Sequence, residues 1–175
     1  ISMAKHIAIV ITILLIAIAA ESATFSYPYK RQNGNYTLFA RGFLDPQNAI
    51  RSELGLPSLT WDAKLARYAR HYANSRRGDC ALRHSGGPYG ENIFWGSGYG
   101  WSPAQAAAAW ISEQQYYDLS SNSCVDGEQC GHFTQVAWRN TKRVGCARVV
   151  CYGNLGVFMT CNYDPPGNYI GQKPY

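Results

Sequence analysis

The chain has 175 residues, 46% of them hydrophobic, 14% aromatic and only 15% charged, so it is long enough for one domain with a real core and too short for two of ordinary size. This composition excludes a disordered chain. A formal net charge of +5 suits adhesion to acidic walls or membrane surfaces, but no run of Lys and Arg of the kind that follows nucleic acid is present.

Residues 1–22 have the features of a secretory signal peptide. A charged start at residues 3–6 precedes an apolar run at residues 7–20, and the small residues that follow offer cleavage points. The apolar run is too short to span a bilayer comfortably, which argues against a retained membrane anchor. We interpret residues 1 and 2 as a translation artefact and expect a secreted mature chain that begins near Ala23.

Residues 23–44 show no sustained hydrophobic period, so we predict an extended arm or linker there. The arm contains Asn35-Tyr36-Thr37, a glycosylation sequon, which makes Asn35 a candidate glycan acceptor in a secreted protein. The folded domain is then expected to span residues 45–175.

Two helices are predicted at the start of this domain. Asp45 and Pro46 have the pattern of an N-cap followed by proline at the first helical position, and Gly55 supplies the stop. The second helix ends at Gly78. Its apolar face recurs at helical spacing and consists of Trp61, Leu65, Ala69, Tyr72 and Ala73.

The third helix has the clearest start, because Ser102, Pro103 and Gln105 form the pattern of a capping box. The helix runs to Glu113, which lies beyond the first turn and its favourable dipole. The charge of Glu113 must therefore be explained by exposure or by a partner. A further short helix is predicted over residues 132–138.

The last part of the domain is predicted to be a hairpin. Strands at residues 143–152 and 155–163 flank Gly153-Asn154, a dipeptide suited to a two-residue turn. If that turn is right, successive residues on the two strands face each other outward from it, and the register of the whole hairpin is fixed.

Six cysteines in a secreted chain indicate three disulfides. The hairpin register places Cys146 directly across from Cys161. The remaining four cysteines allow three pairings, and the short loop from Cys124 to Cys130 favours a local bridge. The predicted set is therefore Cys146–Cys161, Cys124–Cys130 and Cys80–Cys151.

One constellation of candidate site residues emerges, consisting of His84, Glu91, Glu113 and His132. Zinc takes imidazole nitrogen and carboxylate oxygen, and an open site leaves room for a water. However, the spacings of 7, 22 and 19 residues match no local ligand motif. By spacing alone, separate surface groups are the simpler interpretation, and no catalytic residue is assigned.

A second candidate site is apolar. Tyr116, Tyr117 and Leu119 lead into the loop that begins at Cys124, and such an aromatic segment is suited to covering a lipid. The alternative is that these side chains complete the core.

The sequence resembles the superfamily of cysteine-rich secretory, antigen five and pathogenesis-related (CAP) proteins. Two signature motifs carry the resemblance, at residues 131–139 (GHFTQVAWR) and 161–171 (CNYDPPGNYIG). Shorter matches occur at residues 59–62, 72–76 and 90–92. The match covers residues 45–175 and is strongest to the plant pathogenesis-related class one branch.

The resemblance implies an α+β fold, a three-layer α-β-α sandwich with a small, mainly antiparallel sheet stapled by three disulfides. It also implies that His84, Glu91, Glu113 and His132 converge in a cleft. Some relatives bind zinc there, although the resemblance implies no required cofactor. The family's disulfides agree with the pairing predicted above.

For function, the resemblance implies a secreted, apoplastic and monomeric plant defence protein, acting by binding sterol or another lipid of fungi or oomycetes at a membrane or cell-wall surface. Two alternatives remain open. Cleavage between Asp164 and Pro165 would release residues 165–175 as a signalling peptide, or His84 and His132 with one glutamate would hold zinc in a hydrolase.

The sequence departs from the family pattern at two positions. The segment from Gln47 to Arg51 lacks the histidine usual in the first helix, and Leu119 stands where an aromatic residue is common. The second departure lies in the predicted lipid segment.

Overall fold

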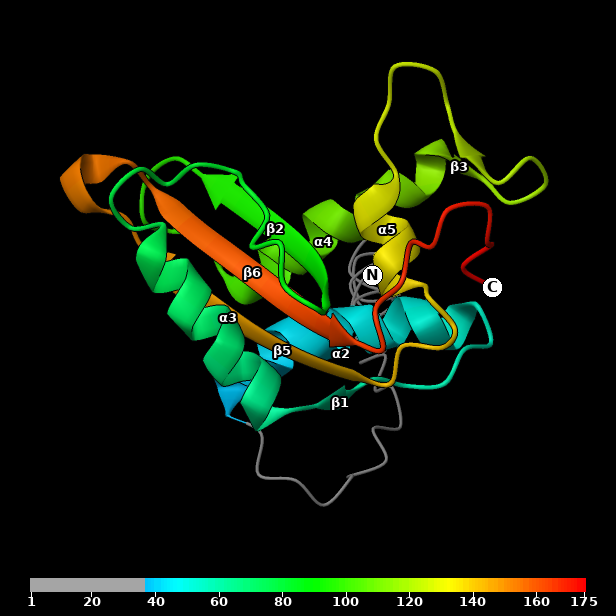
Figure 1. Ribbon diagram of the computed structural model, residues 1–175, viewed down its shortest axis with the longest axis horizontal. Coiled ribbons are helices and arrows are strands. Elements are labelled where there is room, and N and C mark those ends of the chain that lie inside the picture. Colours follow the sequence, from blue (N-terminus) through cyan, green and yellow to red (C-terminus); the bar gives the residue numbers. More distant parts are fainter. Residues whose placement is uncertain (1–36) are drawn as a thin grey trace, which may run out of the picture. The chain divides into compact units, whose positions relative to one another are not determined.

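The computed structural model describes residues 37–175, which lie within one compact unit (Figure 1). Its helices are α2 (Leu38–Glu53), α3 (Ala63–Ser75), α4 (Pro103–Ser112) and α5 (Gly131–Val136). Its strands are β1 (Thr60–Trp61), β2 (Gly90–Gly96), β3 (Tyr117–Asp118), β4 (Ser123–Cys124), β5 (Arg143–Val150) and β6 (Val157–Asp164). The predicted signal peptide, residues 23–36 of the arm and Asn35 lie outside the described residues. Within the described part, no helix is long and apolar enough to cross a membrane.

The first helix begins earlier than predicted, so residues 38–44 are helical rather than part of an extended arm. Thr37 is the N-cap, and its side chain accepts a hydrogen bond from the Ala40 amide. Pro46 lies inside the helix. The early turns bury Phe43, which stacks on Trp110 of α4. The stabilisation from burying Phe43 outweighs the cost of the helical hydrogen bond that Pro46 cannot make. The predicted helix start at Asp45 is therefore wrong.

The second helix also differs at its start. Leu65, Ala69 and Ala73 form its buried face as predicted. Trp61, however, lies in β1, because Asp62 caps the helix by accepting hydrogen bonds from two amides of the first turn. The third helix begins with the complete capping box predicted at Ser102.

The sheet has the strand order β1-β5-β6-β2, in which only β1 and β5 are parallel. One apolar cluster joins α2, α4 and α5 to one face of the sheet, and a second cluster joins α3 to the other face (Figure 1). These are the three layers that were predicted. The short strands β3 and β4 form a separate ribbon.

The hairpin register is as predicted, with Cys146 opposite Cys161. Gly153 and Asn154 both have positive φ, and the Leu155 amide donates to the Tyr152 carbonyl, as a tight two-residue turn requires. The structure contains the disulfides Cys80–Cys151, Cys124–Cys130 and Cys146–Cys161. The first ties the loop before β2 to the end of β5.

Gln47 and Arg51, in the segment that departs from the family pattern, are both fully buried. Gln47 accepts a hydrogen bond from the Tyr163 hydroxyl and donates to the Phe43 carbonyl. The Arg51 guanidinium donates to four backbone carbonyls. One belongs to Val136, the last residue of α5, and two belong to Trp138 and Thr141 in the segment that follows α5. Burial lowers the pKa of Arg51 to about 10. These contacts fix α2 against the segment that carries His132.

Candidate functional site

In the structure the four predicted residues form two histidine–glutamate pairs. In the first, His84 Nδ1 lies 2.9 Å from Glu91 Oε1. Glu91 also accepts hydrogen bonds from the Ser85 amide and from the Asn162 side chain. Asn162 is the cross-strand partner of Glu91 in the β2–β6 register, so the sheet fixes the position of the Glu91 carboxylate. The carboxylate in turn holds the loop at His84 and Ser85.

The two members of this first pair differ in exposure, because the His84 side chain is 60% exposed and the Glu91 side chain only 5%. The hydrogen bond with Glu91 raises the pKa of His84 above its ordinary value, against the opposing effect of partial burial. Burial by itself raises the pKa of Glu91, but hydrogen bonds from His84, Ser85 and Asn162 outweigh it and leave that pKa lowered. Both shifts favour the charged pair.

In the second pair, His132 Nδ1 lies 2.6 Å from Glu113 Oε1. Glu113 follows the last residue of α4, and its other oxygen accepts hydrogen bonds from the amides of His132 and Phe133. These amides belong to the first turn of α5, where helix N–H groups have no partner within the helix. Glu113 therefore caps the N-terminus of α5 although it belongs to a different element. The α5 amides and His132 are the partners that explain the charge of Glu113. The His132 ring also stacks on Trp110.

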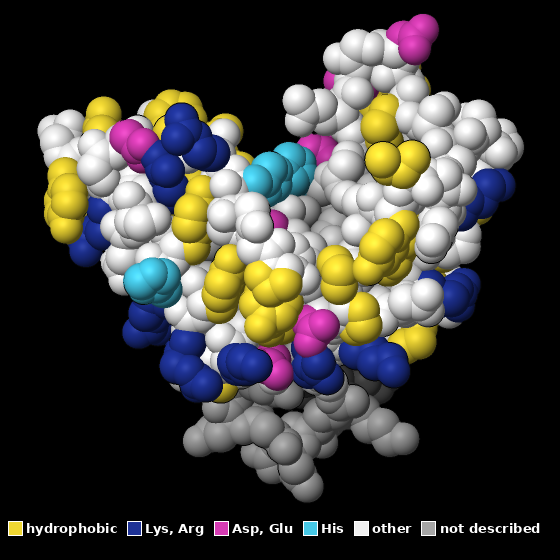
Figure 2. Space-filling view, in the orientation of Figure 1, with side chains coloured by type: hydrophobic (Ala, Val, Ile, Leu, Met, Phe, Trp, Pro, Cys, Tyr) yellow, Lys and Arg dark blue, Asp and Glu magenta, His cyan; other side chains and the backbone are white. Residues whose placement is uncertain are grey.

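The two pairs are held from opposite sides of β2. Successive residues of a strand point to opposite faces, so Glu91 and Asn92 direct their side chains apart. The Glu91 carboxylate contacts the His84 ring, whereas the side-chain amide of Asn92 donates a hydrogen bond to the His132 carbonyl. Figure 2 shows histidine side chains beside acidic ones at the notch in the upper part of this face.

In both pairs Nδ1 faces a carboxylate, which leaves Nε2 as the free imidazole nitrogen. A carboxylate behind the histidine is the arrangement that commonly orients a metal ligand. Within residues 37–175, however, no group of three or more His, Cys, Asp or Glu side chains is arranged to hold a metal ion. The histidine and glutamate side chains of the two pairs are therefore not arranged as a three-ligand zinc centre. Zinc binding at this site stays a prediction.

The three predicted lipid residues have different surroundings. Tyr117 packs on Phe133 and on Tyr175, and its hydroxyl donates to Asn122. Tyr116 is half-buried and Leu119 is exposed.

Tyr117 lines a cavity of about 290 Å³ that we call the loop–tail cavity. It is open to solvent and lies between the β3–β4 loop, α5 and the C-terminal tail, and the larger side chains that line it include Tyr117, Trp138, Tyr169 and Pro174. Tyr116 and Leu119 do not line it.

Sequence reasoning missed the C-terminal tail as part of this cavity. The Pro174 carbonyl accepts a hydrogen bond from the Arg139 amide, and the Gln172 carbonyl accepts one from Asn122. Tyr169 packs on Trp138. The available signal was the group of aromatic and proline residues in the segment 165–175, which was interpreted from the sequence only as a releasable peptide.

Comparison with known proteins gives a consistent result. The model of the Cysteine-rich secretory protein family (CAP) matches residues 44–163. "Pathogenesis-related protein PR-1" of Medicago truncatula is 58% identical over 162 residues, covering 93% of this chain and 94% of that protein. "Pathogenesis-related protein PRMS" of Zea mays is 48% identical over 166 residues, covering 94% and 96%.

Among solved structures, Schistosoma mansoni venom allergen-like protein 4 has the same fold. Its TM-score is 0.65 at 21% identity, and the match covers 80% of this chain and 95% of that one. The chain thus belongs to the cysteine-rich secretory (CAP) protein family, as a pathogenesis-related defence protein of the plant PR-1 type.

Proposed function

We propose that this protein is secreted into the apoplast and acts against fungi or oomycetes by binding sterol or another lipid in the loop–tail cavity. The curated plant relatives support the defence role. The three disulfides support secretion, because they form and persist in an oxidising compartment. The net charge of +5 favours contact with an acidic membrane or wall surface.

The observation that carries the proposal is a cavity whose lining includes three aromatic side chains, those of Tyr117, Trp138 and Tyr169. Its volume of about 290 Å³ lies near the lower end of the range of small-molecule sites, roughly 300–1,000 Å³, so it holds part of a sterol. Leu119 follows Tyr117 closely in the chain, Ile170 follows Tyr169, and both are exposed. They offer apolar surface for the part of the ligand that stays outside.

The test is a titration of the mature, disulfide-intact protein with dehydroergosterol, a fluorescent sterol. We expect saturable binding that Tyr169→Ser weakens about fivefold to tenfold, since losing one aromatic contact costs about 1–1.5 kcal/mol. Tyr116→Ser is the matched control, because Tyr116 does not line the cavity. Equal weakening by both variants would show that the ligand does not bind in the loop–tail cavity. If neither sterol nor a fatty-acid probe binds at all, the proposed lipid function is wrong.

Release of the C-terminal peptide is a second candidate, favoured by the exposure of Pro165 at the end of β6. Release would require local opening, because the Asp164 carbonyl accepts from the Lys142 amide and the Pro165 carbonyl from the Thr141 hydroxyl. Mass spectrometry of fluid from wounded tissue distinguishes this function from lipid binding. It predicts the peptide of residues 165–175 together with a chain ending at Asp164.

The zinc hydrolase has less support, since no metal-holding group of three acidic, histidine or cysteine side chains lies in the described part of the chain. Zinc titration of the wild type and of His132→Gln checks it. Stoichiometric binding that is lost in the variant would revive this function.

A further inference from the structure

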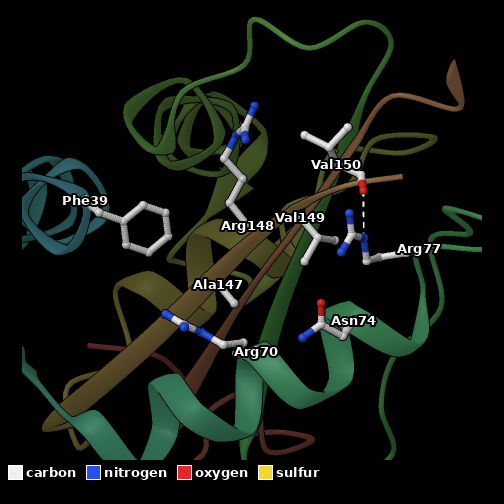
Figure 3. A pocket seen from close by; sticks show the side chains of 8 residues that line it. All are labelled: Phe39, Arg70, Asn74, Arg77, Ala147, Arg148, Val149 and Val150. Carbon is white, nitrogen blue, oxygen red and sulfur yellow. Dashed lines mark hydrogen bonds between the residues drawn. The ribbon is translucent and has the colours of Figure 1, made fainter. Parts of the chain in front are cut away.

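A groove of about 490 Å³ lies between α2, α3 and β5, away from both the histidine–glutamate pairs and the loop–tail cavity. Its floor includes Ala147 and Val149 of β5, and Phe39 of α2 stands at one end (Figure 3). Three arginine side chains surround the floor, with Arg70 on one side, Arg148 on the other and Arg77 opposite Phe39 (Figure 3). Nothing in the proposed lipid function uses this groove.

The groove runs along an open edge of the sheet. β1 pairs with β5 only at Arg143 and Val144, and no other described strand lies on that side of β5. Four consecutive residues of β5, 147–150, line the groove. Because alternate residues point to opposite faces of a sheet, a run of neighbours lines one groove only where that groove follows the strand edge.

The backbone of Arg148 faces this edge. In an antiparallel pair, alternate residues direct N–H and C=O toward the partner strand or away from it. The Cys146–Cys161 pair has a Cα–Cα distance of 4.0 Å, which identifies a pair without backbone hydrogen bonds between the strands. Arg148 is two residues further along β5, so its N–H and C=O also point outward.

Hydrogen bonds at the same edge agree with this parity. The Val144 carbonyl accepts from the Asp62 amide, and the Val150 carbonyl accepts from Arg77 Nε at 2.9 Å. Between them, no hydrogen bond from the described residues reaches the N–H or C=O of Arg148. By the same parity Cys146 also directs its N–H and C=O outward, and no hydrogen bond from the described residues reaches them. The edge therefore presents free backbone donors and acceptors at Cys146 and Arg148, between the occupied carbonyls of Val144 and Val150.

Two of the three guanidinium groups are held in place by the fold. Arg148 donates from Nε to the Trp101 carbonyl and from Nη2 to the Tyr99 carbonyl. Arg77 lies over the Tyr152 ring in addition to its bond with Val150. In both cases at least one terminal nitrogen remains for a ligand.

Arg70 is exposed, and it makes no hydrogen bond or ion pair with any other described residue. None of the residues that line the groove is acidic. The groove therefore presents three positive charges without a compensating negative charge, which is complementary to an anionic occupant.

Three kinds of ligand could fill the groove, and their charge and shape distinguish them. The chain's own residues 23–36 contain Lys30 and Arg31 and no Asp or Glu, so their charge does not complement the groove. A small anion would satisfy the arginines but not the apolar floor or the free strand edge. An extended peptide satisfies all three, because its backbone pairs with the edge while alternate side chains reach the arginines.

We propose that the β5 edge groove binds an extended acidic segment of a partner protein, which adds to the sheet beside Arg148 and places its carboxylates on Arg70, Arg77 and Arg148. The partner is recognised by alternating acidic and small or apolar residues in an extended conformation. The contact supplies a docking function separate from lipid binding.

The test uses the mature full chain and a fluorescein-labelled, acetylated peptide that alternates aspartate with threonine. We expect saturable binding by fluorescence anisotropy, weakened at least tenfold in Arg70→Glu. Arg67→Glu is the matched control, since Arg67 lies on the same helix, is also exposed and does not line the groove. We expect it to change the affinity less than twofold.

Two further probes separate strand pairing from plain charge attraction. A peptide with proline in place of the threonines loses every second backbone N–H and has its φ fixed by the proline rings, so it cannot pair regularly with a strand edge, and we expect it not to bind. Hydrogen exchange at the Arg148 amide should slow several-fold on binding the original peptide. Equal binding of the proline peptide, full competition by inorganic phosphate, or equal loss in Arg67→Glu would each overturn the proposal.

Discussion

The two histidine–glutamate pairs have the same chemistry but different roles in the fold. Glu91 is nearly buried in the sheet and holds an exposed histidine on a loop, with side-chain exposures of 5% and 60%. Glu113 and His132 are 16% and 24% exposed, and Glu113 also binds two amides of α5. The first pair fastens a loop to the sheet, and the second fastens one helix to another.

This difference indicates that the two pairs contribute to stability in different ways. A carboxylate that binds two backbone amides supports the position of a whole helix, and through it the segment that lines the loop–tail cavity. A carboxylate whose main partner is a solvent-exposed histidine supports a local contact that pH and salt weaken. The predictions below separate these roles.

The largest effect is expected for Glu113→Gln. The neutral amide accepts weaker hydrogen bonds from the His132 and Phe133 amides and presents a donor where an acceptor is needed. We expect the free energy of unfolding in urea to fall by about 2–3 kcal/mol. Glu128→Gln is the control, because Glu128 is exposed and should change stability by less than about 0.5 kcal/mol. Similar losses in both variants would contradict the capping role of Glu113.

Glu91→Gln should have a smaller effect on the same measurement. The variant loses charge-assisted hydrogen bonds from His84 and Ser85, but it also removes the cost of burying a carboxylate. We expect a loss of about 1–2 kcal/mol. A loss larger than that of Glu113→Gln would reverse the proposed division of roles.

The smallest effect is the pH dependence of the His84–Glu91 pair. Because the His84 pKa is raised, its contribution is complete below the ordinary value of 6.5 and is lost as pH rises through the folded pKa. Because the Glu91 pKa is lowered, its contribution is complete above the ordinary value of 4.5 and is lost as pH falls through the folded pKa. The pair should therefore stabilise the protein most between these two values.

Two measurements check this window. The stability difference between wild type and His84→Gln should be largest between about pH 4.5 and 6.5 and should shrink above it, staying small because His84 is exposed. In an NMR titration, Glu91→Gln should move the His84 pKa down toward its ordinary value. An unchanged His84 pKa in that variant would show that Glu91 does not control the titration.

Local patterns predicted much of the fold. The capping box at Ser102 and the turn at Gly153 depend on residues within a few positions, so sequence alone identified them. The register of that turn then placed Cys146 opposite Cys161. Local rules failed at Asp45, because the helix start was decided by the contact between Phe43 and Trp110, far apart in the chain.

The candidate site could be predicted only in part, for the same reason. The position of Glu113 beyond the first turn of its helix identified a carboxylate that needs a partner. The family resemblance implied that the four residues converge, but neither argument could assign the pairs. The docking of the tail through Tyr169 and Pro174 depends on contacts with Trp138 and Arg139, which no local pattern records.

The most direct test of the lipid function is photocrosslinking with a diazirine-labelled sterol, followed by peptide mapping. We predict crosslinks to the tail near Tyr169 and to the segment around Tyr117, and fewer of them in Tyr169→Ser. Crosslinks confined to the loop around His84, or unchanged labelling in the variant, would contradict sterol binding in the loop–tail cavity.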